Sequence, residues 1–371
     1  MTATAERLAD EFDRLVMLVG DQTEEWDRAG SIPRNLLRDL GSRGMLCPQV
    51  DARYGGIGAG SLDTGEATAR IGSLCSSLRS VMTSQGMAAW TIGRLADSGQ
   101  RQALLSDLVQ GRLAAIGFSE AGAGSDLSAM TTTIRREDGE LVVDGAKVWV
   151  TAACYADFLV IVGHHEDGAG AVVVPTTAPG VRVRRVGDPL GCRAAGHADV
   201  TLDSVRLPLD ALLGGTSYSL PMLVTTALAY GRMSVAWGCV GILRACLRAT
   251  TRHAAKRRQF GRPLAEHQLV ARHLAELFVA EQAATRICEH ASRCWDAGSA
   301  DLVVATILAK HTGASQAVKG AASAVQVLAS AGAHDGHVVA RAYRDAKLME
   351  IIEGSSEICQ LILAEHAVAT G

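Results

Sequence analysis

Apolar residues recur every three or four positions through the first third of the chain, which is the spacing of one face of a helix. The first such stripe comprises Leu8, Phe12, Leu15, Val16 and Val19. Pro33 indicates the start of another helix, because its fixed φ suits the first helical turn. Further helical patterns follow over residues 64–71, 82–95 and 100–110. We therefore predict an N-terminal α-helical domain of residues 1–112.

The spacing changes near Leu113, where β-branched and aromatic runs replace the helical stripes. The runs lie at 131–134, 141–143, 147–150, 158–162, 171–175, 181–183, 200–202 and 205–207. Asp138-Gly139 and Asp144-Gly145 separate the first three runs, and Asp-Gly is a strong signal for a two-residue hairpin turn. This pattern predicts a central antiparallel β-barrel or sandwich over residues 113–219.

Long helical patterns return from Leu220 to the end of the chain. They cover residues 233–255, 264–294, 302–331 and 355–369, with breaks at Gly332, Gly336 and Gly354. Long alanine-rich helices of this kind favour a four-helix bundle over residues 220–371. The expected fold class is α+β, in the order helices, β domain, helical bundle.

Composition excludes several functional classes. With 48% hydrophobic and 20% charged residues the chain is globular, and its net charge of −3 gives no basic surface for nucleic acid. No apolar run reaches the roughly 18 residues of a membrane span, and the N-terminus lacks a signal pattern. The nine cysteines form no Cys-x-x-Cys pair. We expect reduced thiols and a cytoplasmic location. His334 and His337 lack further ligands at suitable spacing, so no metal site is predicted.

One carboxylate, Glu353, stands directly before a glycine at which the helical pattern breaks. The surrounding run is Ile351-Ile352-Glu353-Gly354-Ser355-Ser356-Glu357-Ile358. Glycine permits a sharp turn, and serine at a helix start accepts hydrogen bonds from free backbone N–H groups. A helix N-terminus also attracts phosphate. The run thus suits a base beside an anion site, although an exposed acid before a helix would give the same pattern.

The loop 117–126 reads Gly-Phe-Ser-Glu-Ala-Gly-Ala-Gly-Ser-Asp and invites a dinucleotide interpretation. It does not fit the Rossmann fingerprint, because Leu127 stands where a third small residue belongs and a predicted hairpin follows instead of a helix. Backbone N–H groups and hydroxyls in such a loop still suit a ring system or a pyrophosphate.

Four separated motifs resemble signatures of the acyl-CoA dehydrogenase family. Two are similar to that family's flavin-binding β domain, namely the loop 117–126 and the strand Lys147-Val148-Trp149-Val150-Thr151. The segment 253–268, with Arg257, Phe260 and Gln268, resembles the C-terminal signature. Arg344-Asp345-Ala346-Lys347 and the run around Glu353 resemble the final motif. The resemblance extends from about Leu8 to Ala367.

The resemblance implies FAD, held between the β domain and the helical bundle and partly by a neighbouring subunit. Ser125, Arg232 and Gly354 are implied contacts of the substrate. Arg257 and Phe260 would reach the FAD of the partner subunit, so at least a homodimer is implied, and a tetramer stays open. The full set of implied cofactor residues is Phe118, Ser119, Gly124, Ser125, Trp149, Thr151, Arg257, Phe260, Gln268, Gln326, Ser355, Ser356 and Glu357.

Glu353 is the implied catalytic base, which removes an α-proton while a β-hydride moves to flavin N5. Such a carboxylate works best when it is dry and its pKa is raised toward the working pH. Some relatives place the base on the first helix of the bundle, at the position of Gly231 here. Because glycine cannot act as a base, Glu353 is the single candidate.

Three departures from the family's pattern concern the substrate and the adenosine end of FAD. A Gly-Gly-x-Gly turn commonly follows the glutamine, but this chain has Ala329-Ser330-Ala331-Gly332 after Gln326. Ala229 replaces an aspartate that helps several relatives to hold CoA. His197 lies in an element usually rich in Ser and Thr, and we expect it to be a surface-strand residue in preference to a specificity residue.

The chain also resembles the branch that makes hydroxymalonyl or methoxymalonyl extender units on an acyl carrier protein in polyketide and antibiotic biosynthesis. This implies oxidation of a short acyl or hydroxyacyl thioester, on carrier protein or CoA, with an acceptor such as an electron-transfer flavoprotein. A short-chain acyl-CoA dehydrogenase of general metabolism, a flavin oxidase or monooxygenase, and a non-enzymatic helical scaffold are the alternatives.

Overall fold

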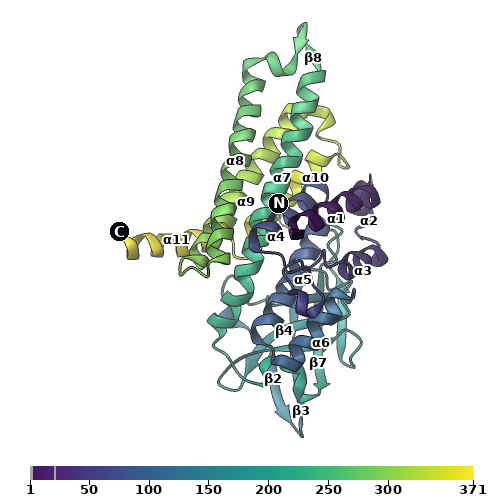
Figure 1. Ribbon diagram of the computed structural model, residues 1–371, viewed down its shortest axis with the longest axis vertical. Helices are drawn as coiled ribbons and strands as arrows, with labels where there is room; N and C mark the ends of the chain where they lie inside the picture. The colour runs from purple at the N-terminus through teal and green to yellow at the C-terminus, as the bar shows by residue number, and fades with distance from the viewer. Residues whose placement is uncertain (1–2, 21) are drawn as a thin grey trace.

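The protein is described here by a computed structural model covering residues 3–20 and 22–371. Six α-helices form the N-terminal part, and the first three lie at the right of the view in Figure 1. They are α1 (Ala3–Val19), α2 (Gln22–Ala29), α3 (Arg34–Ser42), α4 (Ser61–Leu74), α5 (Ser76–Leu95) and α6 (Ser98–Val109).

Three residues of the expected apolar stripe of α1 are buried, Phe12 is partly buried and one is exposed. Leu8, Leu15 and Val19 belong to the hydrophobic core, whereas Val16 is 38% exposed. Val16 directly follows Leu15, so the two point about 100° apart around the helix and cannot share one face. Helix α5 is buried along most of its length because α4, α7 and β1 pack around it.

Seven strands form the middle part of the chain and lie at the lower end of the molecule in Figure 1. They are β1 (Ala114–Gly117), β2 (Thr133–Glu137), β3 (Glu140–Val150), β4 (Phe158–His165), β5 (Gly168–Pro175), β6 (Val181–Arg185) and β7 (Ala198–Leu207). They form one sheet in the order β1-β4-β2-β3-β7-β6, and β5 pairs with β4. The prediction of a β domain is confirmed, but its pairing is mixed, because β1 runs parallel to β4.

The two Asp-Gly pairs have different roles. Asp138 and Gly139 form the expected hairpin turn between β2 and β3, both with positive φ. Asp144 and Gly145 lie inside the continuous strand β3, where its register with β7 shifts. A Cβ atom on Gly145 would stand 2.8 Å from the Cα of Thr132, so this glycine marks a bulge under close backbone packing. The hairpin predicted at this second pair is therefore wrong.

The remaining helices are α7 (Leu220–Lys256), α8 (Gln268–Asp296), α9 (Leu302–Leu328), α10 (Val338–Ile351) and α11 (Ser356–Thr370). Helix α7 packs against α4 and α5 and against α9 and α10 of the bundle. Helices α7 and α8 extend as a hairpin from the body, with β8 (Arg258–Gln259) and β9 (Arg262–Pro263) at its tip (Figure 1). Helix α11 projects from the opposite side of the bundle to the N-terminal helices.

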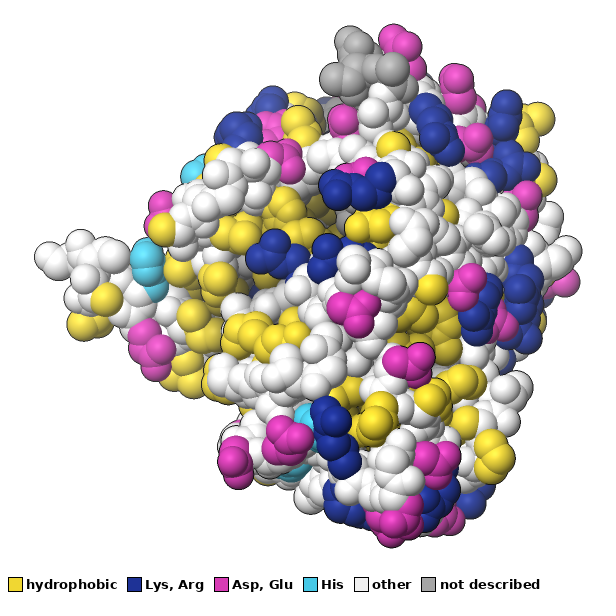
Figure 2. Space-filling model, turned by 60° about the horizontal axis from the view of Figure 1, so that its bottom comes forward, with side chains coloured by type: hydrophobic (Ala, Val, Ile, Leu, Met, Phe, Trp, Pro, Cys, Tyr) yellow, Lys and Arg dark blue, Asp and Glu magenta, His cyan; other side chains and the backbone are white. Residues whose placement is uncertain are grey.

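Several large apolar side chains of the C-terminal helices are exposed in the single chain. Hydrophobic side chains gather beside the projecting helix α11 in Figure 2. The exposed members of α8, α9 and α11 are Leu269, Phe278, Val279, Leu308, Leu361 and Val368. Among the described residues, no helix is long and apolar enough to cross a membrane.

Candidate active site

Glu353 lies in the turn between α10 and α11. Helix α10 ends at Ile351, and Glu353 and Gly354 then adopt positive φ values of 55° and 93°. A positive φ at a non-glycine residue is costly and concentrates at functional sites. Ser355 caps α11, because its side chain accepts a hydrogen bond from the Ile358 N–H. The expected serine cap is therefore present.

Two buried cations hold this turn by its backbone. The Nε atom of Arg232 in α7 donates to the carbonyl of Glu353 at 3.1 Å. The Nζ atom of Lys310 in α9 donates to the carbonyl of Gly354 at 2.5 Å. Arg232 is 6% exposed and Lys310 is fully buried. Because both donors come from long, packed helices, the backbone that carries Glu353 is fixed from two sides.

One oxygen of the Glu353 carboxylate is shielded from water. The Oε2 atom is buried and has no hydrogen-bond partner in the described chain, although the residue as a whole is half-buried. Burial raises the pKa of this carboxyl to about 7, against the opposing effect of Arg232, Lys310 and Arg79. A carboxylate with this pKa can accept a proton near neutral pH.

Gly231 in α7 faces this carboxylate directly. A Cβ atom on residue 231 would overlap Oε2 of Glu353, stand 2.6 Å from its Cδ atom and stand 2.8 Å from the Sδ atom of Met87. The position from which some relatives are expected to supply a base is therefore filled here by the carboxylate of Glu353 itself. Only glycine fits this position without moving the acid.

The glycine loop is held from inside by Glu120. Its carboxylate accepts hydrogen bonds from the backbone and hydroxyl of Thr131 and Thr132, and from Nζ of the buried Lys147 at 2.8 Å. Burial alone would raise the pKa of Glu120, but these bonds lower it to about 2. Lys147 also donates to the carbonyl of Phe118. The loop is thus anchored to β3 by an ion pair that water does not reach.

The outer part of the loop is open. Phe118 is buried and Ser119 is half-buried, whereas Gly124 and Ser125 are exposed. A Cβ atom on Gly124 would meet no atom within 4 Å. The backbone there can be approached closely by a ligand.

Trp149, Thr151 and His197 form a second group at the end of β3. Trp149 has a φ of 56° and is 50% exposed, so its ring does not fill a core. The Oγ1 atom of Thr151 lies 3.2 Å from Nδ1 of His197. The expectation that His197 is a surface residue is wrong, because it is 8% exposed and its Nε2 atom is buried without a partner. Burial and the charge of Arg79 lower the pKa of His197 to about 4, so the ring is neutral at pH 7.

Of the other predicted cofactor residues, those of the α7–α8 hairpin lie far from Glu353 in this chain, whereas Ser356 and Glu357 follow it directly. Arg257, Phe260 and Gln268 are at the tip of the α7–α8 hairpin, where Phe260 is 95% exposed with a φ of 48°. The 26 residues of α7 from Gly231 to its end span about 38 Å. Gln326 is exposed in the last turn of α9, and the strained Ala329, with a φ of 53°, follows it. Ser356 opens α11, and Glu357 is exposed in its first turn.

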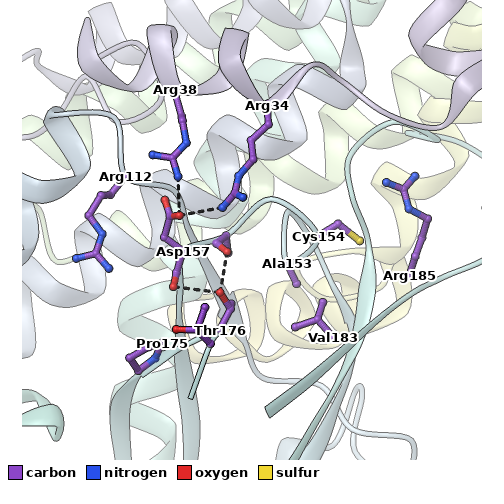
Figure 3. A pocket seen from close by; sticks show the side chains of 12 residues that line it. Arg34, Arg38, Arg112, Ala153, Cys154, Asp157, Pro175, Thr176, Val183 and Arg185 are labelled. Atoms are coloured by element: carbon purple, nitrogen blue, oxygen red, sulfur yellow. Dashed lines mark hydrogen bonds and ion pairs between the residues drawn. The ribbon is translucent and has the colours of Figure 1, made fainter. Parts of the chain in front are cut away.

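A separate basic hollow of about 750 Å³ lies where the N-terminal helices meet the β domain. Figure 3 shows Arg34 and Arg38 pointing at Asp157, with Oδ1 contacts of 2.8 and 2.7 Å. Arg112 and Arg185 line the same hollow, and Arg112 pairs with Asp107. None of the predicted site residues lines it, and its ion pairs join two parts of the fold.

The chain matches three domains of the acyl-CoA dehydrogenase family. The N-terminal domain matches residues 2–112, the middle domain 115–205 and the C-terminal domain 222–368. The chain belongs to this family. It is 30% identical to the probable acyl-CoA dehydrogenase YngJ of Bacillus subtilis (strain 168), over 94% of this chain and 93% of YngJ. It is 28% identical to the human mitochondrial short-chain specific acyl-CoA dehydrogenase, over 92% of this chain and 84% of that enzyme.

A solved structure is more similar in sequence. It is described as FkbI for biosynthesis of the methoxymalonyl extender unit of the Fk520 polyketide immunosuppressant. The identity is 62% with a TM-score of 0.93, over 97% of this chain and 99% of that one.

Membership of the family makes this protein an FAD-dependent dehydrogenase. The residues present fit a flavin, because the open backbone at Gly124, the exposed ring of Trp149 and the unpartnered carboxylate of Glu353 each lack the contacts that a bound ring system and substrate would give. Ser119, Ser125 and Thr151 are the polar groups available to hold it. When bound, FAD supplies the acceptor for a hydride.

Sequence reasoning missed the buried charged residues that support the site. Lys310 and Arg79 are fully buried, and Glu120 was seen as part of a motif without its clamp to Lys147. A usable signal was present, because Arg79 is a lone charge within the otherwise uncharged run 76–93 of α5. A charge in the middle of a buried helix is rare unless it has a partner or a function.

Proposed function

We propose that this protein oxidises a short acyl or hydroxyacyl thioester carried by an acyl carrier protein, in the formation of a methoxymalonyl-type extender unit for polyketide biosynthesis. The observation that carries the proposal is the 62% identity to FkbI over nearly the whole chain. FkbI is described as serving that biosynthesis, and the other relatives named above are much less similar.

In this proposal Glu353 is the base that removes the α-proton. Support comes from its shielded Oε2 atom, its pKa of about 7 and the room that Gly231 leaves for it. The substrate has to bring its α-carbon to this carboxylate. Ser125 and Gly354 are the proposed substrate contacts, together with Arg232, which also holds the Glu353 backbone. The enolate oxygen that develops would need donors such as backbone N–H groups.

The proposed functional unit contains at least two copies of the chain. Arg257, Phe260 and Gln268 would serve the FAD of the neighbouring copy, because the length of α7 keeps them about 38 Å from the Glu353 of their own chain. The exposed Phe260 and the exposed apolar residues of α8, α9 and α11 support such an assembly, because large exposed apolar surfaces mark interaction sites.

Flavin bleaching tests the carrier. Oxidised, FAD-loaded protein is mixed anaerobically with the same hydroxyacyl group on an acyl carrier protein and on CoA. Rapid bleaching by the carrier-protein form, with slow or no bleaching by the CoA form, is the expected result. Bleaching by acyl-CoA with no response to the carrier protein would show instead a short-chain acyl-CoA dehydrogenase.

Two further observations separate the remaining alternatives. A dehydrogenase needs an added acceptor, such as an electron-transfer flavoprotein, to turn over repeatedly. Oxygen consumption in step with product would favour an oxidase or monooxygenase. A purified protein that is colourless and releases no flavin on denaturation would favour a scaffold.

A further inference from the structure

His197 lies opposite Thr151, one step beyond the end of the β3–β7 ladder. The last residue pair of this antiparallel ladder is Val150 with Ala198, so Thr151 and His197 are the next pair outward. Directly opposite residues of an antiparallel pair place their side chains next to each other. The N–H of Val186, which follows β6, donates to the His197 carbonyl at 2.9 Å and holds the backbone of His197 from its other side. The position of the imidazole is therefore set by the sheet.

The imidazole of His197 contacts two of the residues that are expected to hold the flavin. Its Nδ1 atom lies 3.2 Å from Oγ1 of Thr151, and its ring centroid lies 5.6 Å from that of Trp149. Trp149 is half exposed and Thr151 is half-buried, whereas His197 is buried. His197 thus supports both side chains from inside the protein.

The two ring nitrogens of His197 have different surroundings. Burial lowers the pKa of this side chain to about 4, with a smaller contribution from the charge of Arg79, so the ring is neutral at pH 7 and carries one N–H. Nδ1 has the Thr151 hydroxyl within hydrogen-bond distance, whereas Nε2 is buried without a partner in the described chain. A proton on Nε2 would make it a buried donor with no acceptor.

Hydrogen bonding therefore favours the proton on Nδ1. Buried N–H groups without an acceptor are rarer in proteins than buried acceptors without a donor. With the proton on Nδ1, His197 donates to Oγ1 of Thr151, and Nε2 is left as a bare acceptor. The Thr151 hydroxyl then has its own hydrogen to give to another group. Within residues 3–20 and 22–371, Oγ1 of Thr151 has no other hydrogen-bond partner.

We propose that His197 is a positioning residue for the cofactor: its Nδ1–H group holds the Thr151 hydroxyl as a donor, with the hydroxyl hydrogen directed at the bound flavin. This role goes beyond the oxidation of a particular thioester and depends only on the binding of FAD.

An imidazole suits this role better than the Ser or Thr that is more usual in the element around residue 197. A second hydroxyl could either donate to Thr151 or accept from it, because both hydroxyls rotate. The direction of the Thr151 hydrogen would then stay open. A neutral imidazole with its proton on Nδ1 can only donate at that atom, so the direction is fixed.

A hydroxyl held as a donor makes the flavin easier to reduce. Reduction adds electron density to the ring, and a fixed donor stabilises negative charge where it develops. Without the N–H of His197 the Thr151 hydroxyl can rotate, and the donor is no longer held. We expect an effect of about tenfold on the reduction equilibrium, the size of one hydrogen bond. For a two-electron couple this is a fall of about 30 mV in the midpoint potential.

The experiment measures the midpoint potential of the FAD-loaded protein by anaerobic equilibration with a reference dye, without any substrate. His197→Phe keeps a planar ring but has no N–H, and the amide nitrogen of His197→Asn can replace Nδ1. Thr151→Val and the double variant with His197→Phe complete the cycle. The matched control is His165→Phe, because His165 is 1% exposed at the end of β4 and donates through Nδ1 to the carbonyl of Ile134 at 2.8 Å.

His197→Phe and Thr151→Val should each lower the potential by about 30 mV, and the double variant should lower it no further, because His197 acts through Thr151. His197→Asn should keep most of the wild-type potential, and His165→Phe should keep all of it. An unchanged potential in His197→Phe would overturn the proposal. A further fall of similar size when His197→Phe is added to Thr151→Val would also overturn it, because the imidazole would then act on the flavin without Thr151.

A second pair of variants keeps the test decisive if His197→Phe does not fold or does not retain flavin. Asparagine places its amide nitrogen near the position of Nδ1, whereas glutamine places it one atom farther along the side chain. His197→Gln should therefore show the lower potential and His197→Asn should not, and equal potentials in these two variants would overturn the proposal. Because no thioester is present, this result is independent of the choice between carrier protein and CoA, which the flavin-bleaching experiment decides.

Discussion

The carboxylate of Glu353 occupies the space that a side chain on Gly231 would need. The two residues are far apart in sequence, Gly231 in α7 and Glu353 in the turn after α10, yet a Cβ atom at 231 would stand 2.6 Å from the carboxylate carbon. The carboxylate of Glu353 thus fits because residue 231 of α7, the first helix of the bundle, is a glycine without a side chain.

Gly231→Ala should displace the carboxylate and slow flavin reduction by substrate about 10- to 100-fold, because misplacement of a reacting group by about 1 Å has this effect. Flavin content should be unchanged. The matched control is Gly93→Ala in α5, where an added Cβ meets no atom within 4 Å. Stopped-flow reduction measures both variants, and an unchanged rate in Gly231→Ala would show that the acid is not held at this position during catalysis.

Glu353→Gln should retain FAD and lose reduction by substrate by a factor of about 10²–10⁴, the usual contribution of a general base. In the wild type, kcat/KM should rise with pH through about 7, as the carboxyl loses its proton. An unchanged reduction rate in the variant would remove Glu353 from the mechanism.

The same substitution predicts a change in stability with pH. The pKa of Glu353 is raised in the folded state to about 7 from 4.5, so folding favours the protonated form. The stability of the wild type relative to Glu353→Gln is therefore greatest below pH 4.5 and falls as pH rises through 7. The fall is about 3 kcal/mol from the size of this shift. Denaturant unfolding of both proteins across this range measures the difference, and parallel curves would contradict the raised pKa.

Lys310→Met should release the carbonyl of Gly354 and remove a charge that lowers the pKa of Glu353. We expect the rising limb of the kcat/KM profile to move to higher pH and kcat to fall. Lys319→Met, at an exposed position of the same helix, is the control and should leave the profile in place. A loss of kcat without any shift of the profile would mean that Lys310 acts through the backbone alone.

Ala329→Gly should stabilise the protein. Ala329 has a φ of 53° and a ψ of −131°, a conformation that suits glycine. Relief of about 1–3 kcal/mol of strain outweighs the roughly 0.5–1 kcal/mol entropic cost of glycine. Thermal unfolding measures the gain, and Ala331→Gly in the same short helical turn is the control that should destabilise. A lower melting temperature in Ala329→Gly would show that the alanine is not strained.

Mixed assemblies test the sharing of residues between copies. Arg257→Glu and Glu353→Gln should each be inactive alone. Co-expressed with different tags and purified through both, they should recover part of the activity, because one site of each mixed dimer then has an intact base and an intact neighbour. No recovery in tag-selected mixed dimers would contradict the contribution of Arg257 across the interface.

The order of helices, strands and helices followed from the spacing of apolar residues, because burial of one face imposes its period on the sequence. The position of Glu353 before a capped helix could also be predicted, because Gly354 permits the turn and Ser355 can cap the helix that follows. Asp144-Gly145 misled because a bulge and a hairpin use the same residues, and only the pairing of β3 with β7 distinguishes them.

The support of the site could not be predicted, because it depends on contacts between distant segments. His197 resembles a surface residue until the fold buries its ring beside Thr151. Lys310 looks like an ordinary helix cation, and its burial follows from the packing of α9 against several other helices. An apolar stripe marks a face that packs, but it does not show which distant segments will enclose a charged residue.

The positions of Gly231 and Arg232 next to each other in α7 have a mechanical consequence. Gly231 leaves space for the Glu353 carboxylate, and Arg232, the next residue, donates a hydrogen bond to the Glu353 carbonyl. Both contacts therefore depend on the axial position of one 37-residue helix, α7. A shift of α7 along its axis by a fraction of a turn would close the space beside Gly231 and displace the hydrogen bond from Arg232 to the Glu353 carbonyl together. The position of the Glu353 carboxylate therefore depends on how α7 packs in the bundle. Because α7 also carries the distant hairpin tip, a displacement of the tip along the helix axis would also displace Gly231 and Arg232 beside that carboxylate.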